Sequence, residues 1–330
     1  MDNVNQTYKP GILLQKSSGE EVKSIFCKFA PHAVYANPVR PHELLFFDKA
    51  KRISGATNLQ DPESVITYIH ATGDHQFYGH GQFLPDGASY LATERATDYR
   101  GKIVLRDSKT HQILREYPLA GLGPHDCVLI NDHKVLAVAV SGILGEEGMG
   151  EITGDGEVVF LELESGKILD SMKPDRKDHA PGHLSISSRG HIAVLLATDD
   201  NAPNPSGFLA IGKVGGTLKT LYGPRELHKR ESVFTLSPLI DEDHKRVLTT
   251  NTRASVVSCW DLETGEYITH FDIPSPVGIV ISEDKNFYLV SAGMDFLFKI
   301  DVHTLKLTDI YSNINQGRYQ AHTLPLLNSL

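Results

Sequence analysis

The feature that most constrains this chain is a repeat of short paired strands that recurs along its 330 residues. Four hairpins share one form, in which an apolar strand, a polar turn with Gly or Thr and a second strand follow one another, at 102–117, 158–172, 256–271 and 296–311. Alternation of apolar and polar residues indicates strands, and Gly in the turns supplies a positive φ. A further pair of short strands precedes such hairpins, as at 83–92, 184–196 and 280–290. Four strands in each repeat are typical of a β-propeller blade.

The spacing of the repeats predicts seven blades in a single all-β domain over residues 1–330. Their first strands are expected to start at His32, His80, His125, His183, Ser232, Gly278 and His322, with intervals of 48, 45, 58, 49, 46 and 44 residues. The longest interval contains a Gly-rich insert at 142–156. The last blade lacks outer strands of its own, and we expect residues 1–27 to supply them from 12–14 and 22–26. Closure by strands from both termini removes open sheet edges.

Composition excludes several classes of partner. The 32 Lys and Arg residues against 41 Asp and Glu residues give a net charge of −9, which argues against nucleic acid or an anionic membrane as a partner. No apolar run approaches the roughly 20 residues that a membrane helix needs, so no membrane insertion is predicted. The three cysteines, Cys27, Cys127 and Cys259, are too few and too far apart for a disulfide framework or a thiolate zinc site. A monomer is expected.

Two stretches resemble a known bacterial family. The first is Asp74–Phe83 followed by Pro85-Asp-Gly87 and Ala92-Thr-Glu94, and the second is Gly121–His125 followed by Leu136–Ile143. Together they are similar to a family of seven-bladed propellers of unknown function. The resemblance implies a periplasmic protein that is associated with imelysin-type iron-uptake proteins and di-haem oxidases, and therefore metal handling. The first residues lack a signal-peptide pattern, so a cytoplasmic location is the alternative.

The histidines supply the main functional prediction, because several of the 16 fall at equivalent positions of the repeat. If first strands line a central channel, five imidazoles should surround one of its mouths: His32, His80, His125, His183 and His322. Loops on the same face carry carboxylates, of which Glu94 is the best placed, and His75 is a candidate ligand at the rim. Imidazole with nearby carboxylates suits a divalent transition metal, and we expect iron, copper or zinc.

Three interpretations of the histidine ring remain open. The protein is a metal-binding propeller in iron or copper handling, an enzyme such as a lactonase or a metal-dependent oxidase or hydrolase, or a scaffold for a protein partner. In the first two, a metal ion or small ligand binds at the channel mouth. The third involves no small ligand. Apart from these three functions, a purely structural interpretation has each Gly-His form hydrogen bonds within its own blade, as in WD-repeat propellers. The single Trp-Asp pair, Trp260-Asp261, lies in a blade without such a histidine, which weakens this last interpretation. Known enzyme motifs such as G-x-S-x-G are absent.

Overall fold

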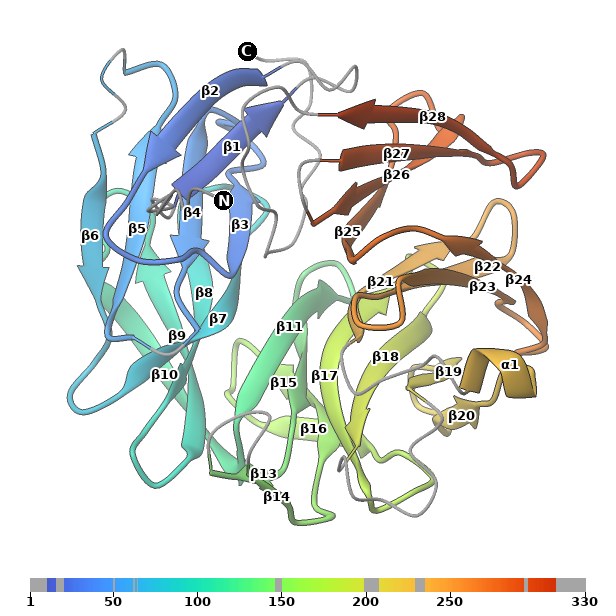
Figure 1. The fold of residues 1–330 in the computed structure, drawn as a ribbon. Coiled ribbons are helices and arrows are strands. Elements are labelled where there is room, and N and C mark those ends of the chain that lie inside the picture. The colour runs from blue at the N-terminus through green and yellow to red at the C-terminus, as the bar shows by residue number, and fades with distance from the viewer. Residues whose placement is uncertain are drawn as a thin grey trace, which may run out of the picture.

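The fold is all-β and propeller-like. A computed structural model describes residues 11–15, 21–49, 51–61, 63, 65–145, 150–198, 208–228, 235–293 and 296–312. Within them, six four-stranded antiparallel sheets follow one another along the chain. Figure 1 shows the sheets arranged around a common centre, which the first strand of each sheet faces. These first strands contact one another from sheet to sheet.

Each four-stranded sheet is built from strands in chain order, with the first strand at one edge and the fourth at the other. The first three sheets comprise β3 (Ala33–Ala36), β4 (Glu43–Phe47), β5 (Ile53–Asn58) and β6 (Thr67–His70); β7 (Gln76–Phe83), β8 (Ser89–Arg95), β9 (Arg100–Asp107) and β10 (Ile113–Leu122); and β11 (Pro124–Ile130), β12 (Val135–Val140), β15 (Glu157–Glu162) and β16 (Ile168–Met172). The next three comprise β17 (His179–Ile186), β18 (His191–Thr198), β19 (Leu209–Lys213) and β20 (Lys219–Leu221); β21 (Thr235–Asp241), β22 (Arg246–Asn251), β23 (Val256–Asp261) and β24 (Tyr267–Asp272); and β25 (Pro276–Ile281), β26 (Phe287–Ala292), β27 (Phe296–Asp301) and β28 (Leu307–Ser312).

The four hairpins that define the repeat form as expected, as β9–β10, β15–β16, β23–β24 and β27–β28. Three of their turns share one hydrogen-bond pattern, in which Asp107, Asp261 and Asp301 accept the amide of a Thr three residues later. An Asp that accepts local amides favours a tight turn over a longer strand. These hydrogen bonds lower the pKa of all three carboxyl groups.

The four sheets from β7–β10 to β21–β24 pack both of their faces against neighbouring sheets, and β12 illustrates the pattern. Val135, Ala137 and Ala139 enter the core shared with the β17–β20 sheet, whereas Leu136, Val138 and Val140 enter the core shared with the β7–β10 sheet. Successive side chains of a strand point to opposite faces, so a strand covered on both sides is apolar throughout. All six residues are at most 5% exposed.

Three short elements lie outside the six sheets. The Gly-rich insert forms the small hairpin β13 (Ile143–Leu144) and β14 (Glu151–Ile152), and the one helix in the described part of the chain is α1 (Arg225–His228). No described helix is long and apolar enough to cross a membrane. The N-terminal strands β1 (Gly11–Gln15) and β2 (Glu21–Phe26) pair with each other.

Two strands form within residues 1–27, as β1 and β2, and their expected place as outer strands of the last blade stays a prediction. Ile12 and Ile25 are buried in the same core cluster as Leu44 and Phe46 of β4, and Figure 1 places the hairpin over the β3–β6 sheet. The inner strands expected after Gln320 lie outside the described residues, as does Ser232. The seventh blade, closure of the circle and the single domain therefore remain predictions.

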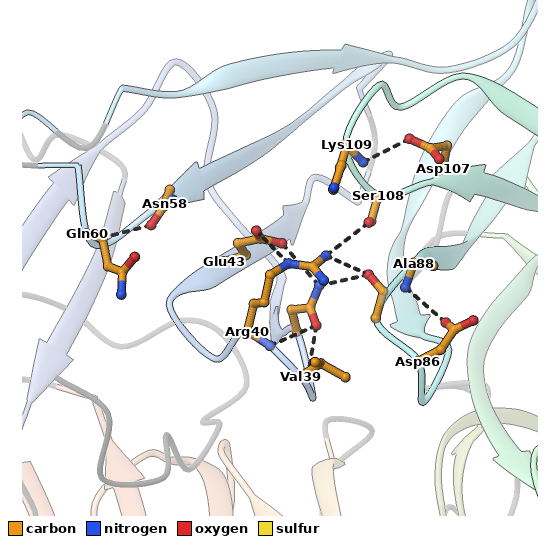
Figure 2. Close-up of polar contacts among 12 residues, drawn as sticks. Val39, Arg40, Glu43, Asn58, Gln60, Asp86, Ala88, Asp107, Ser108 and Lys109 are labelled. Carbon is orange, nitrogen blue, oxygen red and sulfur yellow. Dashed lines mark hydrogen bonds and ion pairs between the residues drawn. The ribbon is translucent and has the colours of Figure 1, made fainter.

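A polar clamp fixes the first sheet against the second. Arg40, in the turn between β3 and β4, pairs with Glu43 at 2.7 Å and donates hydrogen bonds to the Gly87 carbonyl and the Ser108 hydroxyl (Figure 2). The Asn37 side-chain amide donates to the same carbonyl at 2.9 Å. This clamp joins the turn of one sheet to the turns of the next, so it helps to set the relative position of β3 and β7 at the centre.

Candidate metal centre

Four histidines from four consecutive sheets converge at the centre of the molecule. His32 lies directly before β3, and His80, His125 and His183 lie on β7, β11 and β17. One nitrogen of each ring lies within 4.8 Å of a nitrogen of every other ring. The ring centroids are separated by 4.5 Å (His125–His183) to 6.1 Å (His32–His125). The last three imidazoles are at most 5% exposed.

A break in strand pairing accompanies each of these three histidines. The register of β7 with β8 shifts between Phe77 and Gly81, that of β11 with β12 between Pro124 and Asp126, and that of β17 with β18 between Pro181 and Leu184. A bulge bends a strand and redirects a side chain. Here it occurs around His80, His125 and His183 in turn.

The same positions in the next two sheets carry small residues. The amide of His80 donates to the hydroxyl of Thr93 on the adjacent strand. The amides of Ser237 on β21 and Gly278 on β25 donate in the same way to Thr250 and Ser291. The repeat thus continues through these sheets, and Ser237, rather than the expected Ser232, is the counterpart of His80 in the fifth.

Gly79 allows His32 to approach the cluster. Its φ is +99°, a conformation that L side chains rarely adopt, and a Cβ at this position would lie 2.6 Å from Cδ2 of His32. The histidine of one sheet therefore packs against a backbone position of the next where only glycine fits. The His32 and His80 rings meet edge to face, with centroids 4.9 Å apart.

Asp126 is the charged partner of the cluster. Its Oδ1 lies 3.2 Å from Nδ1 of His80, and its two oxygens also accept the backbone amides of Cys127 and Leu184. A carboxylate accepts hydrogen bonds only, so this contact suits the His80 tautomer with its proton on Nδ1 and its lone pair on Nε2. A carboxylate behind an imidazole is the usual outer partner of a metal-binding histidine.

Tyr35 closes this part of the site. Its hydroxyl lies 3.0 Å from Nδ1 of His80. Burial, and then the negative charge of Asp126, raise the pKa of Tyr35 well above its usual value. The phenol therefore keeps its proton and acts as a neutral hydrogen-bonding group beside His80.

The dimensions of the cluster suit a transition metal. Metal–nitrogen bonds of about 2.0–2.1 Å place any two ligand nitrogens of a tetrahedral site about 3.3 Å apart. In a square-planar site, nitrogens on opposite sides of the metal are about 4.1 Å apart. Nε2 of His125 lies 3.0 Å from Nε2 of His183, and all four rings fall within the 4.8 Å limit. The His125–His183 contact is already close to the tetrahedral spacing, whereas a pair at the 4.8 Å limit would have to close by about 1.5 Å, so the rings would draw together around a bound metal.

The remaining residues predicted as metal ligands are Glu94, His75 and His322. The Glu94 carboxylate accepts hydrogen bonds from Thr72 and forms a buried ion pair with Arg106 at 2.9 Å. His75 lies beside Asp74, with Nδ1 3.2 Å from its carboxylate. Neither belongs to the four-histidine group, and His322 lies outside the described residues.

A partly open cavity adjoins the cluster. Its volume is about 230 Å³, and its polar lining comprises Tyr35, His80, Gln82, Asp126, His183 and Ser237. Two of the four histidines thus form part of its wall. We refer to it as the channel cavity.

The chain matches one known sequence family and is similar in fold to a solved structure. Residues 30–325 match the sequence family described as "Protein of unknown function (DUF1513)". The chain belongs to this family. A search of curated proteins gave no match. Among solved structures, Kuenenia stuttgartiensis hydrazine synthase is similar, with a TM-score of 0.65 at 13% identity over 92% of this chain and 89% of that one. At this identity the likeness concerns the fold alone.

Sequence reasoning did not find two residues of the site in this DUF1513 member, Asp126 and Tyr35. Asp126 carried a usable signal, because it is a charged residue next to His125 in the otherwise apolar strand β11. Tyr35 carried none, since it meets His80 only through the contact between two sheets.

Proposed function

We propose that this protein binds one divalent transition metal ion through His32, His80, His125 and His183, and that it serves in iron or copper handling. The observation that carries the proposal is the convergence of four imidazoles from four different sheets, each with a nitrogen within 4.8 Å of the others. Neutral imidazole is the commonest metal ligand in proteins.

The contacts of the histidines support this proposal over a purely structural role. In the structural alternative each histidine would form hydrogen bonds within its own blade. His80 instead contacts Tyr35 of the preceding sheet and Asp126 of the following one, and His125 contacts His183 of the next. Four imidazoles that face one another, three of them buried, with a carboxylate behind one of them, resemble a ligand set more than separate anchors.

The donor set favours copper or zinc over iron. The group contains four nitrogens and no carboxylate, because Glu94 is engaged by Arg106 and Thr72. Non-haem iron sites usually add a carboxylate to their histidines, whereas all-nitrogen sites suit Cu(II), Ni(II) or zinc. By the family resemblance, we propose a periplasmic location and a role beside iron-uptake proteins of the imelysin type, in which a protein partner would exchange metal with this centre.

Metal binding by the untagged protein tests the proposal. We expect about one equivalent of Cu(II) or Zn(II) by elemental analysis and calorimetry, with weaker binding at lower pH because ligation needs neutral imidazole. Substitution of His80, His125 or His183 by Ala should weaken binding at least tenfold, about 1.4 kcal/mol. His70→Ala, which removes an exposed imidazole from β6, is the matched control and should bind metal as the wild type does.

Two results would overturn the proposal. One is a wild-type protein that takes up none of Cu(II), Zn(II) and Fe(II) under anaerobic and aerobic conditions. The other is unchanged metal binding in all three variants together with lowered melting temperatures. That combination would mean that the histidines are hydrogen-bond anchors, each worth about 1–3 kcal/mol of stability.

A further inference from the structure

From the cavity beside the histidines we infer that the metal centre, if it forms as proposed above, binds a small external ligand from the channel side. The ligand is neutral or carries a single negative charge, and it has one lone-pair donor atom for the metal. This inference rests on the proposed function and adds to it an open coordination position and a route of access.

The geometry of the channel cavity carries the argument. His80 and His183 belong both to the four-histidine group and to the cavity wall, whereas His32 and His125 do not line the cavity. A metal held among the four rings would therefore lie at the end of this space. A site that meets a cavity keeps room for an exogenous ligand, as catalytic and ligand-exchanging metal sites do, whereas structural sites are closed by protein ligands.

The size of the cavity limits the ligand. Its volume of about 230 Å³ greatly exceeds the roughly 15 Å³ that one water requires on the same measure. The space holds several waters or a small organic molecule. It does not hold a macromolecular segment.

The charges of the wall decide the ligand's charge. Asp126 is the one acidic residue of the described lining, which contains no Lys or Arg. A divalent metal, four neutral imidazoles and one carboxylate sum to a single positive charge. A neutral donor or a monoanion is therefore accommodated, while a dianion such as phosphate would bring excess charge into a buried site without a cation to meet it.

Hydrogen-bonding groups are also present for such a ligand. Gln82 belongs to the cavity lining, and its side-chain oxygen accepts the Leu129 amide at 2.8 Å, so the NH2 group is the part of this side chain that can donate to a ligand. The Tyr35 hydroxyl lines the same space. Ligand binding here is addition of a lone pair to the metal or displacement of a bound water, and no bond within the ligand breaks.

Azide binding to the Cu(II)-loaded protein tests the inference. Azide is a small monoanion whose bond to Cu(II) produces a charge-transfer absorption band, so its dissociation constant can be titrated. We expect saturable azide binding to the wild type, without competition from phosphate. Ser237→Leu enlarges a side chain of the cavity wall, in a sheet that contributes no member of the four-histidine group. It should leave the metal content unchanged while weakening azide binding at least tenfold.

Ser185→Leu is the matched control. It makes the same exchange on β17, at a half-buried position outside the cavity lining, and should bind azide as the wild type does. If Ser237→Leu fails to fold, Ser237→Val makes a smaller intrusion and should weaken azide binding about threefold.

The outcomes separate this inference from the proposed function. Absence of metal uptake in the wild type would overturn both. Normal copper content with no azide band would overturn the open position alone. Equal azide affinity in Ser237→Leu and the wild type, or tight competition by phosphate, would overturn the channel route and the charge argument, respectively.

Discussion

Replacement of Gly79 by Ala tests how closely the metal centre depends on contact between sheets. A methyl group there would lie 2.6 Å from Cδ2 of His32, whereas carbon atoms in contact prefer about 3.5–4.0 Å. The His32 ring must therefore move by about 1 Å, because the methyl group belongs to the backbone of β7 and has no rotamer to change.

Two effects of this substitution differ in size and in kind. The φ of +99° at Gly79 is strained for Ala and should lower the free energy of unfolding by about 1–3 kcal/mol. Displacement of His32 acts on the metal, because metal–ligand distances tolerate only about 0.2 Å. Loss of one of four ligands should weaken metal binding at least tenfold, about 1.4 kcal/mol.

Gly190→Ala separates the two effects. Gly190 also has a positive φ, +80°, but a Cβ there would meet nothing within 4 Å. Chemical denaturation should show comparable destabilisation in both variants. Calorimetric titration with Cu(II) or Zn(II) should show weakened binding in Gly79→Ala alone.

The reasoning fails if Gly79→Ala binds metal as tightly as Gly190→Ala while both remain folded. His32 would then either be no ligand or have room to shift without leaving the metal. Equal loss of metal affinity in the two variants would also refute it, since global destabilisation rather than the His32 contact would be the cause.

Three further predictions follow from other contacts. Asp126→Asn removes the charge behind His80 and should weaken metal binding 10- to 100-fold, about 1.4–2.7 kcal/mol. The same calorimetric titration measures this, and unchanged affinity would show that Asp126 does not tune the site. Deletion of residues 1–27 should abolish soluble folding, because it uncovers Phe46, which packs with the β1–β2 hairpin. A stable monomeric product would refute closure by the N-terminal strands. The Arg176 guanidinium lowers the pKa of Asp178 to about 2, so this pair stabilises the fold above about pH 4 and loses its effect as the pH falls towards 2. Asp178→Asn should therefore melt below the wild type at pH 6, and the difference should shrink markedly by pH 2. A difference of unchanged size at pH 2 would refute this assignment.

The local architecture follows from the sequence because its causes are local. Alternation of apolar residues indicates each strand, and Asp, Gly and Thr in the turns set where hairpins reverse. The hairpins at 102–117 and 256–271 accordingly appear as β9–β10 and β23–β24. The uninterrupted apolar sequence of β12 likewise predicts that both faces of this strand are buried.

The candidate site required the tertiary structure. The sequence placed His32, His80, His125 and His183 at equivalent positions of a repeat, which suggested a ring around a channel. It also predicted that the side chains of His80, His125 and His183 converge. The bulges of β7, β11 and β17 and the glycine at position 79 determine how closely the four approach one another.

The partners of the site depended on contacts between sheets. The sequence favoured Glu94 as the carboxylate of the site, yet Arg106 of the same sheet holds it, and Asp126 of another sheet stands beside His80. Strand periodicity reports which face of a sheet a residue occupies. Which residue it meets there depends on how neighbouring sheets twist and pack, and only the folded chain decides that.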